Sequence, residues 1–168
     1  MLGVNDVEID PVAALNATMC DRLNVPAGIR YLHIALEGEE AGKDHLGVYL
    51  FDGNCEVVDF NCAIVARSLG GNADRIEVTL PGEGSYFIGV HQFAGDSGAA
   101  DFTLSWWLVP DGPGNLVVDA PAEVVANSSF DVTIAWPEGL AAGRYLGILE
   151  HANEHVSLHT TRLEVTVP

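Results

Sequence analysis

The chain has 168 residues and carries 24 acidic side chains against seven lysines and arginines, a formal net charge of −17 at pH 7. Nucleic acids and anionic membrane surfaces both attract basic patches, so this charge argues against either one as a partner. Hydrophobic residues make up 48% of the chain, which is enough for a folded core. No apolar run reaches the ~20 residues that span a bilayer.

The N-terminal region, residues 1–23, has neither the basic start nor the continuous apolar stretch of a signal peptide. If the protein is exported, we expect its signal to lie upstream in a longer precursor. Residues 1–19 mix polar and apolar side chains with weak periodicity. We therefore assign residues 1–20 to an extended or poorly ordered lead-in from a preceding segment.

Short segments rich in β-branched and aromatic residues recur along the rest of the chain, with turn signals between them. No segment keeps a helical period over about 10–12 residues. The predicted strands are Asp21–Val25, Tyr31–Glu37, Leu46–Phe51, Glu56–Val58, Ala63–Arg67, Arg75–Leu80, Ser85–Phe93 and Asp101–Val109. Strands at this spacing predict an all-β fold, with a jelly-roll β-sandwich over residues 21–110.

The segment PDGPG at 110–114 is the best candidate for a linker, because prolines and glycines interrupt a strand ladder. A second β pattern follows, with strands predicted at Leu116–Asp119, Phe130–Trp136, Arg144–His151 and Leu158–Val167. We predict a small Ig-like β-sandwich module over residues 114–168, with Trp136 in its core facing Leu146 and Ile148. A module this small needs cover, so we expect it to pack on the first one or to pair with it.

The stretch Val25–Asp52 contains two predicted strands joined by an acidic loop, which makes it either a β-hairpin or a corner of the sandwich. Its carboxylates could offer oxygen ligands to calcium. Those side chains are Glu37, Glu39, Glu40, Asp44 and Asp52. They lack the order of an EF-hand loop, and in so acidic a chain we expect a solvated rim with no bound metal or other cofactor.

Two short motifs resemble catalytic patterns, but their setting argues against catalysis. HANEH at 151–155 matches the H-x-x-E-H pattern of zinc proteases, which requires both histidines on one helix, whereas here it follows a predicted strand. GDSG at 95–98 is similar to the surroundings of trypsin-like nucleophiles, yet it lies in a predicted turn between two late strands. We expect no catalytic residue and no enzyme activity in this chain.

The three cysteines, Cys20, Cys55 and Cys62, cannot all pair within one chain. If residues 55–62 fold back as a tight hairpin, Cys55 and Cys62 come close enough for a disulfide, with Cys20 as a competing partner. Two buried free thiols are the alternative. Secretion would favour the disulfide, because disulfides persist in oxidising compartments.

Several segments occur in a recognisable order: VPAG at 25–28, DHLGVYLFD at 44–52, RIEVTL and PGEGSYFIGVH within 75–91, and DFTLSW at 101–106. In this order they resemble the bacterial pre-peptidase C-terminal domain, a jelly-roll module appended to secreted proteases. GNLVVDAP at 114–121 and WPEGLAAGRYLG at 136–147 are similar to the Ig-like tail that follows this domain in subtilisin-like (S8 family) peptidases.

This resemblance implies a non-catalytic accessory region of a secreted subtilisin-like serine protease, with its own upstream protease domain as a partner. Its expected role is to aid stability or secretion, or to attach the protease to a protein or polysaccharide substrate. The alternative is a carbohydrate- or collagen-binding module of another extracellular hydrolase. Where relatives carry carboxylates, this chain has Ala41, His45 and Gly47, so a calcium site around Asp44 would be degenerate.

Aromatic side chains are the candidates for contact with a substrate surface, namely Trp106, Trp107, Tyr86 and Phe93. Trp106 and Trp107 are neighbours in a predicted strand and must face opposite sides. We expect one of them in the sandwich core and the other at the interface between the two modules, since the small tail needs apolar cover. His33 and His91 lie inside strands at spacings that could place both on one side.

Overall fold

The computed structural model describes residues 2–9, 12–14, 18–38, 45–53, 63–70, 73–94, 99–112, 116–125, 127–136, 138–152 and 157–168. Its strands are β1 (Leu2–Ile9), β2 (Val12–Ala14), β3 (Thr18–Val25), β4 (Ile29–Gly38), β5 (His45–Asp52), β6 (Ile64–Ser68), β7 (Ala73–Thr79), β8 (Gly84–Ala94), β9 (Ala99–Pro110), β10 (Val117–Asp119), β11 (Thr133–Ala135), β12 (Gly143–Ala152) and β13 (Ser157–Val167). The all-β prediction is confirmed, and most predicted strands end within two residues of the observed ones. Predicted strand Glu56–Val58 lies outside the described residues. Within the described part, no helix is long and apolar enough to cross a membrane.

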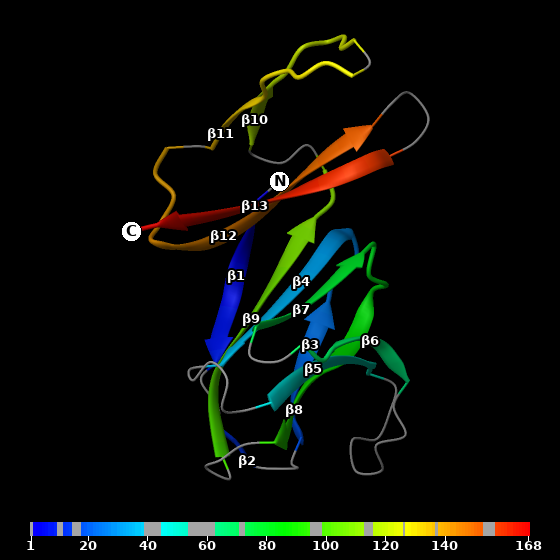
Figure 1. Ribbon diagram of the computed structural model, residues 1–168, viewed down its shortest axis with the longest axis vertical. Helices are drawn as coiled ribbons and strands as arrows, with labels where there is room; N and C mark the ends of the chain where they lie inside the picture. Colours follow the sequence, from blue (N-terminus) through cyan, green and yellow to red (C-terminus); the bar gives the residue numbers. More distant parts are fainter. Residues whose placement is uncertain are drawn as a thin grey trace.

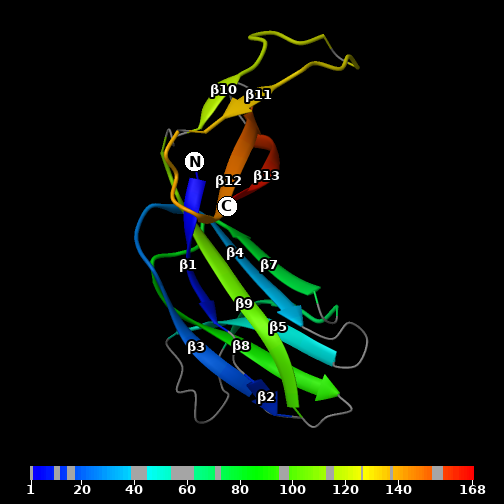
Figure 2. The same cartoon turned by 90° about the vertical axis from the view of Figure 1, so that its left-hand side faces the viewer.

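Two antiparallel sheets form a sandwich in the lower part of Figure 1. One layer contains β1, β9, β4 and β7, with β2 also pairing with β9, and the other has the order β3-β8-β5-β6. Figure 2 shows the two layers face to face. The chain crosses between layers at most turns, as jelly rolls do. Val25–Asp52 is therefore a corner, because β4 and β5 belong to different layers, and the hairpin alternative is wrong.

The sandwich core is built from side chains at alternate strand positions. In β5, Leu46, Val48 and Leu50 are fully buried, and Ile88 and Val90 of the neighbouring β8 lie in the same cluster. The opposite layer supplies Leu32, Ile34, Leu36, Phe102, Leu104 and Trp106. Burial of each such side chain stabilises the fold by roughly 1.5–3 kcal/mol, so this cluster dominates the stability of the sandwich.

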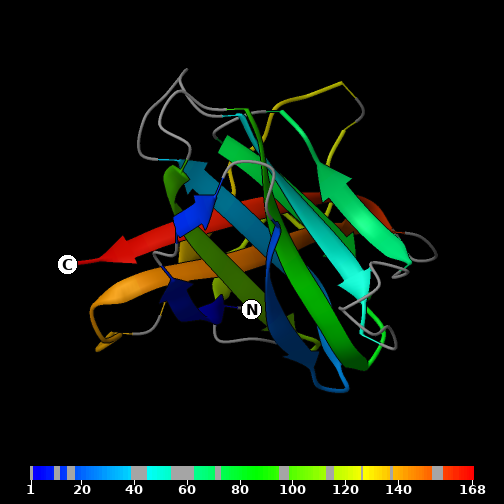
Figure 3. The same ribbon diagram turned by 90° about the horizontal axis from the view of Figure 1, so that it is seen from below.

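The β12–β13 hairpin covers the outer side of the β9-β4 layer, which is why β4 is buried on both faces. Figure 3 shows the hairpin crossing behind β4 and β9. A second apolar cluster fills the contact, made by Tyr31, Ala35, Trp107 and Val109 from the sandwich and Leu146 from β12. The C-terminal segment thus packs on the rest of the chain, as its small size predicted.

Strand β1 joins the hairpin to the sandwich. Its first residues pair with β12, where Leu2 lies opposite Gly147, and its last residues pair with β9, where Ile9 lies opposite Leu104. The register of the β1–β9 pairing shifts between Asn5 and Glu8. The lead-in thus contributes a strand to the same sheet as the hairpin. The module boundaries 1–20, 21–110 and 114–168 stay a prediction.

The short β10–β11 ribbon projects beyond the hairpin at the top of Figure 1. β11 covers only part of the predicted strand Phe130–Trp136. Trp136 is 49% exposed, so the prediction of a core tryptophan facing Leu146 and Ile148 is wrong. The reason lies in the alternation along β12: Leu146 and Ile148 point away from the ribbon and pack against the sandwich.

Candidate functional site

Aromatic side chains gather on the outer surface of the β3-β8-β5-β6 sheet. Because Leu46, Val48 and Leu50 of β5 point into the core, the residues between them point outward. The same alternation applies to β8, where Ile88 and Val90 are buried. The outward rings are His45, Tyr49, Phe51, Phe87, His91 and Phe93, and we call this set the aromatic face.

The rings of the aromatic face contact one another in two groups. Tyr49 and Phe51 are stacked, with ring centroids 5.5 Å apart and an angle of 8° between their planes. Phe93 lies between two histidines, 4.4 Å from the His91 ring and 5.5 Å from the His45 ring. The planes of the first pair are nearly parallel, so each ring covers part of the other, and aromatic side chains of this kind are enriched in protein interfaces.

Gly47 sits in the middle of this face, between His45 and Tyr49 along β5. A Cβ atom at this position would lie 2.7 Å from Leu69 Cδ2 and 2.9 Å from Phe93 Cε2. The glycine therefore lets the Phe93 ring pack directly on the strand backbone. Positions 45 and 47 of β5 therefore carry a histidine ring and leave room for a phenyl ring.

Two arginines bring positive charge to the aromatic face. Arg22 of β3 lies over the Phe87 ring, with its guanidinium carbon 5.3 Å from the ring centroid. Arg67 of β6 is the cross-strand neighbour of Tyr49. In a chain with a net charge of −17, two cations beside partly exposed rings make this face suited to a neutral or anionic ligand.

A second group of polar side chains lies under the β12–β13 hairpin, around His33. The His33 ring is buried and lies 5.4 Å from the Trp107 ring. Its Nδ1 atom is 3.7 Å from Glu77 Oε1 and has no hydrogen-bond partner among the described residues. Burial and then the nearby Arg162 guanidinium lower the pKa of His33 from 6.5 to about 4, so the ring is neutral at pH 7.

The surroundings of His33 hold the hairpin in place. Arg162 of β13 pairs with the Glu77 carboxylate of β7. Burial and then the Glu77 carboxylate raise the pKa of the Tyr31 hydroxyl above its ordinary value. This group therefore contains a neutral imidazole, a neutral phenol and an ion pair. Its ion pair joins the hairpin to the sandwich, so we assign this group a structural role.

The four aromatic residues predicted from the sequence go to different places. Trp106 lies in the sandwich core and Trp107 in the interface with the hairpin, which confirms that they face opposite sides. Tyr86 packs against the core and donates a hydrogen bond to the Gly82 carbonyl at 2.9 Å. Only Phe93 of the four lies on the aromatic face, where it is 38% exposed.

The other rings of the aromatic face were not predicted as contact residues, although their alternation along two strands is visible in the sequence. Tyr49 and Phe51 fall on alternate positions of one predicted strand, His45 continues the same alternation just before it, and Phe87 and His91 fall on alternate positions of another. The two strands pair directly, with Phe51 opposite Phe87. Reading both alternations together would have predicted one shared face.

The acidic residues of the candidate calcium site do not gather in the described part of the chain. Glu37 is the last residue but one of β4, and its carboxylate lies 3.7 Å from the Arg144 guanidinium. Asp52 is at the far end of β5 from the loop, roughly 23 Å away at the rise of an extended strand. Glu39, Glu40 and Asp44 lie outside the described residues. No group of three metal-binding side chains occurs among the residues that are described.

The remaining motifs fall partly outside the described residues. His151 belongs to β12 and contacts Thr161 Oγ1 at 2.9 Å, so the H-x-x-E-H motif begins on a strand. Asn153–His155, the GDSG segment at 95–98, Cys55 and Cys62 all lie outside. Cys20 is in β3.

The expectation that His33 and His91 share one side is wrong. They lie on opposite outer surfaces, one under the hairpin and the other on the aromatic face.

No protein-family model and no curated protein sequence matches the chain. Among solved structures, a periplasmic inhibitor of g-type lysozyme from Aeromonas hydrophila has 15% identity and a TM-score of 0.48, over 63% of this chain and 87% of its own. The pre-peptidase C-terminal domain of a collagenase from Bacillus anthracis has 19% identity and a TM-score of 0.43, over 62% and 90%. A protein from Sulfurospirillum deleyianum has 9% identity and a TM-score of 0.38, over 61% and 97%. These overlaps are partial, and the sandwich architecture rests on the strand pairings of this chain itself.

Proposed function

We propose that this chain is a non-catalytic accessory region of a secreted subtilisin-like serine protease, and that its aromatic face attaches the protease to a protein or polysaccharide substrate. The family part of this proposal rests on the ordered motifs at 25–28, 44–52, 75–91 and 101–106. The attachment part rests on the aromatic face. The secreted location belongs to the proposal as well, since such proteases act outside the cell.

The observation that carries the attachment role is the stacked pair Tyr49 and Phe51 beside the exposed Phe93. The patch continues along β6 and the turn that follows it, where Ile64 is 50% exposed and Leu69 is 40% exposed. A protein surface rarely presents rings and aliphatic side chains together unless a partner covers them. A patch of rings and aliphatic side chains with two arginines at its side suits sugar rings or an extended protein chain.

A carbohydrate- or collagen-binding module of another extracellular hydrolase is the second candidate. The same face would serve, because aromatic side chains such as Tyr49 and Phe51 contact the apolar side of a sugar ring. The two candidates differ in the enzyme to which the chain is attached. An upstream reading frame with the aspartate, histidine and serine of a subtilisin-like domain would favour the first, and a glycosidase domain the second.

The test is retention of the purified protein on insoluble polysaccharides and on fibrillar collagen. We expect retention on at least one of them, and a loss of about tenfold or more in the double variant Tyr49→Ala and Phe51→Ala. Trp136→Ala is the matched control, because it removes an exposed aromatic side chain at the other end of the molecule. Absence of retention on every material, or equal retention of both variants, would overturn the attachment role.

A further inference from the structure

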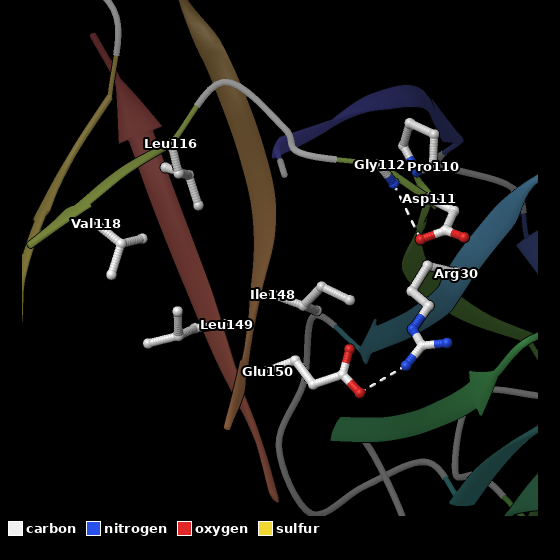
Figure 4. A pocket seen from close by; sticks show the side chains of 9 residues that line it. All are labelled: Arg30, Pro110, Asp111, Gly112, Leu116, Val118, Ile148, Leu149 and Glu150. Atoms are coloured by element: carbon white, nitrogen blue, oxygen red, sulfur yellow. Dashed lines mark hydrogen bonds and ion pairs between the residues drawn. The ribbon is translucent and has the colours of Figure 1, made fainter. Parts of the chain in front are cut away.

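The β10–β11 ribbon and the β12–β13 hairpin form two facing layers with an open apolar interior. Val118 and Ile134 are cross-strand neighbours in the ribbon. Leu149 of β12 and Leu163 and Val165 of β13 occupy the alternate positions that point away from the sandwich. Figure 4 shows Leu116 and Val118 of the ribbon segment pointing toward the hairpin across a gap.

This two-layer unit has fewer strands than a closed Ig-like sandwich. An Ig-like sandwich closes its core with about seven strands, whereas the described part of this unit has two strands in the ribbon and two in the hairpin. Its apolar side chains are exposed as a result. Val117, Val118, Val124, Val125, Phe130 and Trp136 are all at least 42% exposed.

The opening lies along β13. A cleft of about 460 Å³ is lined by Leu116, Ile134 and Trp136 on one side and by the consecutive residues Arg162–Thr166 on the other. Consecutive residues of one strand point to both faces, so the cleft runs along the strand edge. Among the described strands, β13 is the last one of its sheet, and its outer edge pairs with none of them.

The edge of β13 lacks most of the features that normally protect such an edge. Protected edge strands are short, bulged, or carry proline or charged side chains, above all lysine. β13 has eleven residues, and its pairing with β12 is regular from Gly143 to His151. It contains neither lysine nor proline, and its arginine and glutamate, Arg162 and Glu164, pair with each other on the side that faces the sandwich.

From this geometry we infer that the edge of β13 binds an extended polypeptide strand of another protein, with one apolar side chain seated under Trp136. Backbone hydrogen bonds to β13 would add the strand to the sheet, and its inward side chains would complete the open interior. This inference is independent of the proposed role of the aromatic face, which lies on the other sheet.

The charge of the site defines the partner as basic. Residues 116–136 contain Asp119, Glu123 and Asp131 but no lysine or arginine. Arg162, the cation at the cleft, is already paired with Glu77 and Glu164. A second copy of this chain would add another 17 negative charges, so the fitting occupant is a strand that alternates apolar residues with lysine or arginine.

The probe is a fluorescein-labelled peptide of about nine residues, Lys-Val-Thr-Val-Arg-Val-Thr-Val-Lys, followed by fluorescence anisotropy. We expect saturable binding that protects Trp136 from acrylamide quenching. We expect affinity to fall about tenfold or more in Trp136→Ala and in Val165→Glu. Leu80→Ala is the control and should leave the affinity unchanged, because it removes an exposed apolar side chain that belongs to neither the cleft nor the aromatic face. Trp136 is half exposed, so its truncation leaves the fold intact, which the melting temperature checks.

Two N-methylated peptides separate strand addition from simple adsorption. A strand that joins β13 uses the N–H groups of one of its edges, so methylation of alternate residues abolishes binding in one pattern and spares it in the other. Equal binding of both methylated peptides, or of an acidic peptide with glutamates in place of the basic residues, would refute the inference. Self-association of the protein in light scattering, without peptide binding, would also overturn it in favour of a second copy.

Discussion

The buried imidazole of His33 predicts that the protein loses stability as the pH falls from about 7 to 4. The pKa of His33 is about 4 in the folded chain and about 6.5 when the chain is unfolded. Between these values the unfolded chain binds a proton that the folded one does not. Stability is therefore present above pH 6.5 and is lost as the pH falls toward the folded pKa. A difference of about 2.5 pKa units, at about 1.36 kcal/mol per unit, is about 3 kcal/mol.

The structure explains why protonation is unfavourable at this site. The ring lies between Trp107 and the hairpin, where an imidazolium loses its hydration. Arg162 repels the charge, and Glu77, which would attract it, is already paired with that arginine. Arg75 also opposes the charge, whereas Glu164 favours it. Loss of hydration decides the sign, because the charged neighbours largely offset one another.

Urea denaturation between pH 7.5 and 4 measures this effect. In His33→Phe, an aromatic ring that cannot titrate, the fall in unfolding free energy should be about 3 kcal/mol smaller than in the unmodified protein. The comparison removes the common contribution of the acidic residues, and His91→Gln on the other sheet serves as the control. An NMR titration of the His33 ring with a midpoint near 6.5, or equal pH profiles for both proteins, would refute the reasoning.

Three further substitutions test other contacts. Trp107→Ala should lower the unfolding free energy by about 3 kcal/mol in chemical denaturation, because it removes the largest side chain from the cluster under the hairpin. Limited proteolysis of this variant should then cut the hairpin before the sandwich. Asp74→Ala should lower the unfolding free energy by about 2 kcal/mol in thermal unfolding. The reason is that the Asp74 carboxylate accepts hydrogen bonds from Ser68 Oγ at 2.7 Å and from the Gly70 amide at 2.6 Å. A change below experimental error would contradict this. Gly47→Ala should displace the Phe93 ring and cost about 1–3 kcal/mol, and unchanged NMR shifts of the His91 ring would show that the ring had not moved.

The sandwich could be predicted from the sequence because its strands carry local signals. Alternation in β5 and β8 marks the buried positions, and turn residues such as Gly28, with a φ of 78°, mark the crossings. Placing Trp106 and Trp107 on opposite sides needed only the two-residue period of a strand. These inferences hold because each depends on neighbouring residues.

The arrangement around the hairpin could not be predicted, because it depends on partners far away in the sequence. β12 has apolar residues on both faces, with Leu146 on one and Leu149 on the other, so alternation cannot say which face meets the sandwich. The expected core position of Trp136 failed for this reason. The pairing of β1 with β12 is equally invisible, since a strand does not encode its neighbour.

Arginine placement shows how an acidic chain positions this hairpin. Of six arginines, Arg30, Arg144 and Arg162 each pair with a carboxylate across the contact between hairpin and sandwich. These pairs are partly exposed, and such pairs contribute about 0–1 kcal/mol each and weaken with salt. Burial of Trp107 and Leu146 stabilises the same contact by several times more, roughly 1.5–3 kcal/mol for each side chain. Apolar burial therefore holds the hairpin down, while the ion pairs select its register and orientation, and the contact should persist at salt concentrations that screen every one of these pairs.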